Sequence, residues 1–197
     1  MPTFPPSAAM TAMDAIHQRR SVRSFTAQTL DRGTLQSLLA AAVRAPTAMD
    51  QEPWAFVVIQ EASVLDRLST TTKDMLREEA KKSDSPSSEH LLHMANNPHF
   101  HVFHHASTLV VICGKFQGPF VEADCWLAAE NLMLAACAEG LGTCVIGFAV
   151  EALNTAEWKA ELKIPDKMMA IAPIIVGTPA SEGPPASRKP PEILFWQ

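Results

Sequence analysis

Hydrophobic residues along this chain follow two patterns, one typical of helices and one typical of buried strands. From Leu35 to Val43, apolar residues recur at three- and four-residue steps, which predicts an amphipathic helix. Thr29 or Asp31 is expected to cap this helix, and Pro46 to end it, because the residue before a proline resists helical geometry. A shorter amphipathic run, Met13 to His17, predicts another helix near the start of the chain.

Continuous apolar runs predict three buried strands, at Trp54 to Ile59, Ser107 to Cys113 and Met168 to Val176. The run from Cys144 to Phe148 contains Gly147 and predicts a further short strand or a turn. These strands alternate with helical segments along the chain, so the sequence predicts a domain of mixed secondary structure.

Two further helices are expected, at Ser63 to Lys82 and at Glu151 to Leu162. Between the first of these and the histidine-rich segment, Ser83 to Ser88 reads as a polar breaker that contains Pro86. We therefore expect a loop there.

The run from Val121 to Glu139 predicts the most hydrophobic helix of the chain, with little polar face between Asp124 and Glu139. A helix that is apolar nearly all round must be buried all round. One chain of this size is not expected to cover it, which predicts a homodimer with this helix near the interface. Glycine commonly follows a helix end, so the Gly140-Leu141-Gly142 segment is expected to stop it.

The end of the chain has a different composition. Five prolines, with Arg188 and Lys189, lie between Gly177 and Pro191, and the apolar Ile193 to Trp196 follow. A proline-stiffened segment with an apolar tip is poorly suited to forming a core of its own and well suited to reaching across a partner subunit.

The amino-acid composition argues against several classes of function. The 197-residue chain has 47% hydrophobic residues and a formal net charge of -5, which suits one globular domain and argues against nucleic-acid binding. Its four cysteines form no CxxC pair, so we interpret them as core residues in a reducing cytoplasm. The N-terminus lacks the pattern of a signal peptide, and no segment predicts a membrane span.

Positive charge is concentrated near the N-terminus. Three arginines and two serines occupy the six positions from Arg19 to Ser24. Guanidinium groups match the oxygens of a phosphate, and serine hydroxyls add hydrogen bonds. Taken alone, the cluster favours a solvated basic turn, and the rest of the chain shifts the interpretation toward a phosphate site.

Six of the seven histidines lie between His90 and His105. His90 and His93 would share a helix face, which raises the possibility of a metal site, but their spacing fits no established ligand motif. We therefore expect no metal and interpret the segment as a surface-exposed cap or lid. No Ser/His/Asp or Cys/His catalytic pattern and no GxGxxG motif is visible either.

Four segments, taken in order, resemble the FMN-dependent nitroreductase family, and together they span nearly the whole chain. They are Arg19-Arg20-Ser21-Val22-Arg23, Ala45-Pro46-Thr47 leading to Pro53-Trp54, Ala129-Glu130-Asn131-Leu132 through Gly140-Leu141-Gly142 to Gly147, and Arg188-Lys189-Pro190.

This resemblance implies an α+β fold, with a mixed, mostly antiparallel central sheet flanked by helices. It implies an intertwined homodimer with FMN at the subunit interface and a C-terminal arm, residues 178–197, that reaches the partner. The chain would consist of an N-terminal extension, residues 1–12, and a single FMN-binding domain, residues 13–197, which includes this arm. The lid above the cofactor would come from Lys73 to His105.

The resemblance also implies which residues contact FMN. Arg19 and Ser21 would hold the phosphate together with Arg188 and Lys189, and Arg20 would flank them. The remaining implied contacts concern the flavin ring: Arg23 at its pyrimidine edge, Pro46, Thr47 and Ala48 from the other subunit, and the backbone of Val145, Ile146 and Gly147 near N5.

The implied activity is transfer of a hydride from NADH or NADPH to FMN, followed by electron transfer to a nitroaromatic, quinone or enone in a ping-pong cycle. FMN carries this chemistry, so no catalytic side chain is required. A flavin-binding carrier or sensor without turnover is the alternative. Asp50, Glu52 and Glu130 depart from the family's usual amides and leave the flavin potential and the acceptor open.

Overall fold

The computed structural model describes residues 10–82, 85–183 and 187–197. Most of the predicted N-terminal extension therefore lies outside the described residues. The elements in chain order are α1 (Ala12–Gln18), α2 (Arg32–Ala42), the 3-10 turn η1 (Ala48–Asp50), β1 (Trp54–Ile59), α3 (Ala62–Ala80), α4 (Pro86–Asn96), β2 (Thr108–Gly114), α5 (Val121–Ala138), β3 (Gly142–Val145), α6 (Ala149–Leu153), α7 (Ala156–Glu161) and β4 (Met169–Gly177).

The four strands form one sheet in the order β1-β2-β4-β3, and every neighbouring pair is antiparallel. The three predicted strands and the short fourth one are confirmed, and β1 has the predicted bounds. A parallel contact occurs where Ser21 bridges to Thr143 at the edge of β3. The predicted α+β fold is confirmed by this sheet and its helices, with a sheet that is antiparallel throughout its named strands.

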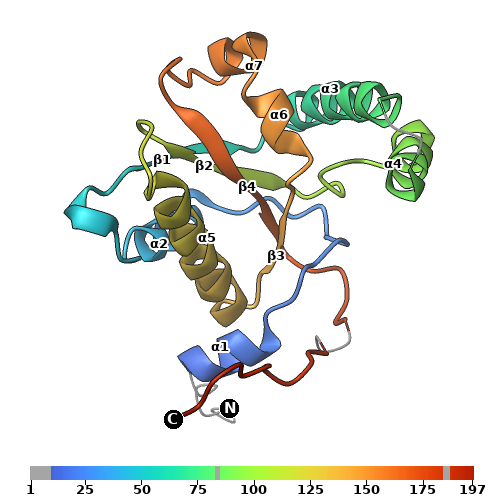
Figure 1. The fold of residues 1–197 in the computed structure, drawn as a ribbon. Coiled ribbons are helices and arrows are strands. Elements are labelled where there is room, and N and C mark those ends of the chain that lie inside the picture. The colour runs from blue at the N-terminus through green and yellow to red at the C-terminus, as the bar shows by residue number, and fades with distance from the viewer. Residues whose placement is uncertain (1–9, 83–84, 184–186) are drawn as a thin grey trace, which may run out of the picture.

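Helices cover both faces of the sheet (Figure 1). Alternate residues of β2 point to opposite faces, so Val110 and Ile112 pack with α2 and α5, whereas Leu109 and Val111 pack with α3 and α6. All four are at most 1% exposed. Burial of one such side chain stabilises the fold by about 1.5–3 kcal/mol, so the central strand holds the three layers together.

Helix α5 is only partly covered by its own chain, as expected from its apolar sequence. Leu132 is fully buried, but Trp126 and Leu127 are 37% and 46% exposed, so this chain alone leaves one face of the helix uncovered. Asp124, in the first turn of the helix, is only 4% exposed. Gly140 follows the helix with a φ of 74°, a left-handed conformation that favours glycine and ends the helix as predicted.

Two predicted boundaries are wrong. The segment interpreted as a breaker contains the start of α4, because Ser85 accepts a hydrogen bond from the Ser88 N–H and proline is favoured in the first helical turn. Residues 83–84 of that segment lie outside the described residues. The single helix predicted from Glu151 to Leu162 is two helices, because the Asn154 side chain bonds the backbone of Ala170 in β4 and Thr155 caps α7.

No helix within the described ranges is long and apolar enough to cross a membrane. The same ranges contain no group of three or more His, Cys, Asp or Glu side chains arranged to hold a metal ion.

Candidate functional site

A cavity of about 570 Å³ lies where β3 turns into α6. We call it the turn cavity. Its volume falls within the range of about 300–1,000 Å³ that is usual for small-molecule sites. Its lining comes from Arg23, from the turn itself, and from α4 with the segment that follows it, which we call the wall. The lining residues are Arg23, His90, Met94, Phe100, Val102, His104, Cys144, Val145, Ile146, Gly147 and Phe148.

The turn presents backbone to this cavity. The Ile146 N–H donates to the Pro173 carbonyl at 2.8 Å, which fixes the turn against β4. A Cβ built on Gly147 meets no atom within 4 Å, so the backbone there faces open space. Within the described chain, no protein acceptor takes the Gly147 N–H. The turn therefore offers an accessible backbone donor to a bound molecule.

The wall contains two histidines, His90 and His104. Burial, followed by the positive charge of Arg23, lowers the pKa of His104 below the ordinary histidine value of 6.5. His104 is therefore neutral at neutral pH, and Arg23 is the permanent cation of this cavity. The predicted role of segment 90–105 as a surface-exposed cap is only partly right, because Val102 and Phe103 are at most 1% exposed.

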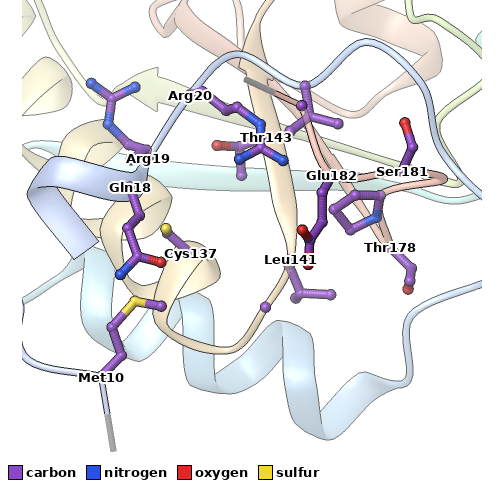
Figure 2. Close-up of a pocket in the computed structure, with 14 residues that line it drawn as sticks. Met10, Gln18, Arg19, Arg20, Cys137, Leu141, Thr143, Thr178, Ser181 and Glu182 are labelled. Atoms are coloured by element: carbon purple, nitrogen blue, oxygen red, sulfur yellow. The ribbon is translucent and has the colours of Figure 1, made fainter. Parts of the chain in front are cut away.

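A second cavity, of about 620 Å³, lies between the N-terminal arginines and the start of the C-terminal arm. We call it the arginine cavity, and Arg19, Arg20 and residues 178–183 line it with other side chains (Figure 2). The Thr26 N–H donates to the Thr178 carbonyl at 2.9 Å, so the start of the arm is paired with the segment after the arginines. Both ends of the chain thus contribute to one cleft.

The two arginines in this cleft are held differently. Arg20 extends beside Thr143 and Glu182, and the two guanidinium groups point in different directions (Figure 2). The Nε atom of Arg19 lies 2.8 Å from an oxygen of Glu130 on α5. The Nε–H makes no hydrogen bond to this carboxylate, so we interpret the contact as an ion pair. Glu130 is one of the three acidic residues that depart from the family's usual amides.

Ser21 lies beside the arginine cavity on the edge of the sheet. Its bridge to Thr143 and the 2.8 Å hydrogen bond from the Val22 N–H to the Thr143 carbonyl attach this segment to β3. The turn cavity begins at the other end of β3, with Cys144 and Val145. The strand therefore connects the two cavities.

The remaining predicted contacts lie elsewhere in the single chain. Pro46, Thr47 and Ala48 line neither cavity. The buried carboxylate of Asp124 accepts the Ala48 N–H at 3.2 Å and holds this loop on α5. The backbone just after this loop is strained, because Met49, Asp50 and Glu52 adopt left-handed conformations with φ values of 56°, 51° and 44°.

Arg188 and Lys189 line neither cavity and are exposed. The Arg188 guanidinium donates to the carbonyl of Ser187 at 2.9 Å. The part of the arm that lines the arginine cavity therefore contributes no positive charge, and Arg188 does not line the cavity within one chain.

Sequence reasoning missed three wall residues, Met94, Phe100 and His104. Their segment was expected to be a lid, but its side chains had no assigned role. The predicted lid also began too early, because Lys73 to Ala80 belong to α3. The Lys73 ammonium donates to the carbonyls of Asn97 and Phe100 at 2.8 and 3.0 Å, which fixes the wall to α3.

The structure is thus an α+β domain with a flanked antiparallel sheet and a cavity at each end of its edge strand β3. The model of the nitroreductase family matches residues 16–177. The chain belongs to the nitroreductase family.

Individual relatives agree with this assignment. The chain is 24% identical over 174 residues to a putative NADH dehydrogenase/NAD(P)H nitroreductase of Archaeoglobus fulgidus, covering 85% of this chain and 84% of that protein. It is 24% identical to an FMN reductase (NADPH) of Bacillus subtilis, covering 94% and 72%. The crystal structure of a nitroreductase with bound FMN from Bacteroides fragilis has the same fold, with a TM-score of 0.81, 24% identity and coverage of 94% and 98%.

Proposed function

We propose that this protein is an FMN-dependent oxidoreductase that takes a hydride from NADH or NADPH and passes electrons to a nitroaromatic, quinone or enone acceptor. Donor and acceptor would use the same face of the cofactor in turn, in a ping-pong cycle. Support comes from the family, from the named activity of the Bacillus subtilis relative and from the FMN in the Bacteroides fragilis structure.

One observation carries this proposal: Arg23 and the turn residues Val145, Ile146 and Gly147 line the same cavity. They come from distant parts of the sequence, and the family resemblance implied that each contacts the flavin ring. The backbone at Gly147 is open, since a Cβ built there meets no atom within 4 Å. Arg19 and Arg20 lie at the other end of β3, where the phosphate of the same molecule would be held.

The residues of this chain would divide the work as follows. FMN supplies the redox chemistry when bound, so the protein contributes binding, orientation and electrostatics. Arg23 stabilises negative charge at the pyrimidine edge of the ring. The Gly147 N–H orients the ring by a hydrogen bond, and Arg19, Arg20 and Ser21 hold the phosphate.

We also propose that the active form is a homodimer with FMN at the interface. The exposed face of α5, with Trp126 and Leu127, gives apolar surface for a partner to cover. The apolar tail from Ile193 to Trp196 is also exposed and gives further surface for a partner to cover. The loop from Pro46 to Ala48 and the pair Arg188 and Lys189 would then complete the partner's site. Sedimentation at micromolar concentration tests this, and a protein that stays monomeric contradicts it.

The activity is tested by adding NADH or NADPH anaerobically to the protein loaded with FMN. Bleaching of the flavin absorbance within seconds, reversed by a quinone, is the expected result. An unchanged band with an excess of both donors would contradict the enzyme and favour a flavin-binding carrier or sensor. A protein that takes up no FMN would contradict both.

A further inference from the structure

The wall of the turn cavity carries a polar group that the family resemblance does not assign. His104 lines this cavity together with Phe100 and Arg23. Its ring lies edge-on to Phe100, with centroids 6.0 Å apart and an interplanar angle of 74°. The ring is therefore held by a neighbour that is itself part of the wall.

An unusual turn places this side chain. His104 and His105 have φ values of 50° and 55°, a left-handed conformation that histidine adopts more readily than most residues do. The two adjacent side chains serve different cavities. His105 lines a separate cavity with Asp66 and stacks on His101 at a centroid distance of 4.5 Å. The turn thus sends one imidazole to the turn cavity and the next one away from it.

The wall is fixed before any ligand arrives. Lys73 of α3 donates to the carbonyls of Asn97 and Phe100, and Arg77 donates to the carbonyl of Ala95 at 2.6 Å. These cations hold the end of α4 and the segment that follows it. A preformed wall loses less entropy when a ligand binds, so its donors act efficiently.

We propose that His104 is a specificity-determining residue that donates a hydrogen bond to an oxygen of the electron acceptor. This inference rests on the proposed function, which places FMN on the turn side of the cavity and the acceptor against the wall. The acceptor class it selects is a flat aromatic or conjugated ring that carries a carbonyl or nitro oxygen. Phe100 and Met94 contact the ring of such a molecule, and His90 lies at the same wall.

The charge state of the wall supports this choice of ligand. The lowered pKa of His104 keeps its imidazole neutral at neutral pH, so it presents one N–H in either tautomer. A neutral donor suits an uncharged carbonyl or nitro oxygen.

Binding of 1,4-naphthoquinone to the oxidised, FMN-loaded protein tests the proposal without turnover. The dissociation constant is read from the change in flavin absorbance. Loss of one neutral hydrogen bond should weaken binding of the quinone to His104→Ala by about three- to tenfold. His104→Asn, which keeps an N–H donor and tolerates the left-handed backbone, should bind within about twofold of the wild type.

Two controls isolate the hydrogen bond. His105→Ala changes the same residue type in the same backbone conformation but outside the turn cavity, and should bind the quinone like the wild type. Naphthalene has the same ring system and no oxygen, so His104→Ala should not weaken its binding. The wild type should also bind naphthoquinone at least about threefold more tightly than naphthalene, a comparison that needs no variant.

Equal quinone affinity in His104→Ala and the wild type overturns the proposal, as does an equal loss in His105→Ala or an equal loss for naphthalene. If His104→Ala does not fold, equal affinity of the wild type for naphthoquinone and naphthalene overturns it. Failure to take up FMN is a separate result that contradicts the proposed function itself.

Discussion

The two cavities at the ends of β3 differ in how far one chain completes them. In the turn cavity, the turn is fixed against β4, the Gly147 N–H has no protein acceptor among the described residues, and Lys73 holds the wall. The arginine cavity has one arginine already paired with Glu130, and the predicted Arg188 does not line it. Under the proposed function, a single chain would therefore supply most of the contacts to the flavin ring, whereas the contacts to the phosphate would depend more on rearrangement and on a second subunit.

A larger side chain at Gly147, on the turn that lines the turn cavity, should have the largest effect on FMN affinity. In Gly147→Leu the added side chain has open space, so the apoprotein should fold, with a melting temperature within about 3 °C of the wild type. The same side chain would occupy the place of the ring and weaken FMN binding about a hundredfold or more, as measured by fluorescence titration. Unchanged FMN affinity in a folded variant would show that the ring lies elsewhere.

Removing positive charge from the arginine cavity should have the next largest effect. Loss of one charge-assisted phosphate contact costs about 1.5–3 kcal/mol, so Arg19→Ala should weaken FMN affinity about ten- to a hundredfold. Riboflavin, which lacks the phosphate, should bind the variant and the wild type equally. Arg67→Ala, which removes an exposed arginine paired with Glu161, is the matched control and should bind FMN normally. An equal loss for both flavins would contradict the assignment.

Releasing Arg19 from its carboxylate should act in the opposite direction. Glu130→Gln keeps the size of the side chain and removes the competing charge beside the guanidinium. Because the pair is partly exposed, its free energy is about 0–1 kcal/mol, so FMN affinity should rise by up to about fivefold. A fall in affinity would show that Glu130 positions Arg19 for the phosphate instead of competing with it.

The smallest expected effect is on the pH dependence of stability, through the histidines His101 and His104. Burial is the largest cause that lowers the pKa values of His101 and His104 below 6.5 in the folded protein. As the pH falls, the unfolded chain therefore binds protons at these histidines before the folded protein does. The stability that the two neutral histidines give the folded protein is fully present above about pH 6.5 and is lost below it. The melting temperature should fall modestly from pH 7.5 to 5.5, and less in His104→Asn. An equal fall in both proteins would show that His104 contributes nothing to this dependence.

Much of the fold could be predicted from the sequence, because apolar runs mark buried strands directly. Strand β1 matches its predicted bounds at both ends, and Gly140 ends α5 as expected. The errors occurred where a local signal has two meanings. Pro86 breaks a helix in most positions but begins α4 here, since its first turn needs no donor at that residue. The break between α6 and α7 depends on Asn154 and β4, a contact that no local pattern contains.

The site was predictable to the extent that the family resemblance named its backbone and its arginines. The resemblance brought Arg23 and Gly147 together, and the structure places both at one cavity. It gave no information on His104, because a turn with two left-handed residues leaves no periodic trace in a sequence. It also missed the ion pair of Arg19 with Glu130, which joins residues far apart in the chain.

A crystal structure of the protein with bound FMN tests the central claim most directly. The claim predicts electron density for the flavin ring against the Gly147 backbone beside Arg23, with the phosphate next to Arg19 and Arg20. A ring that lies away from the turn cavity, or a phosphate with no contact to either arginine, would contradict it.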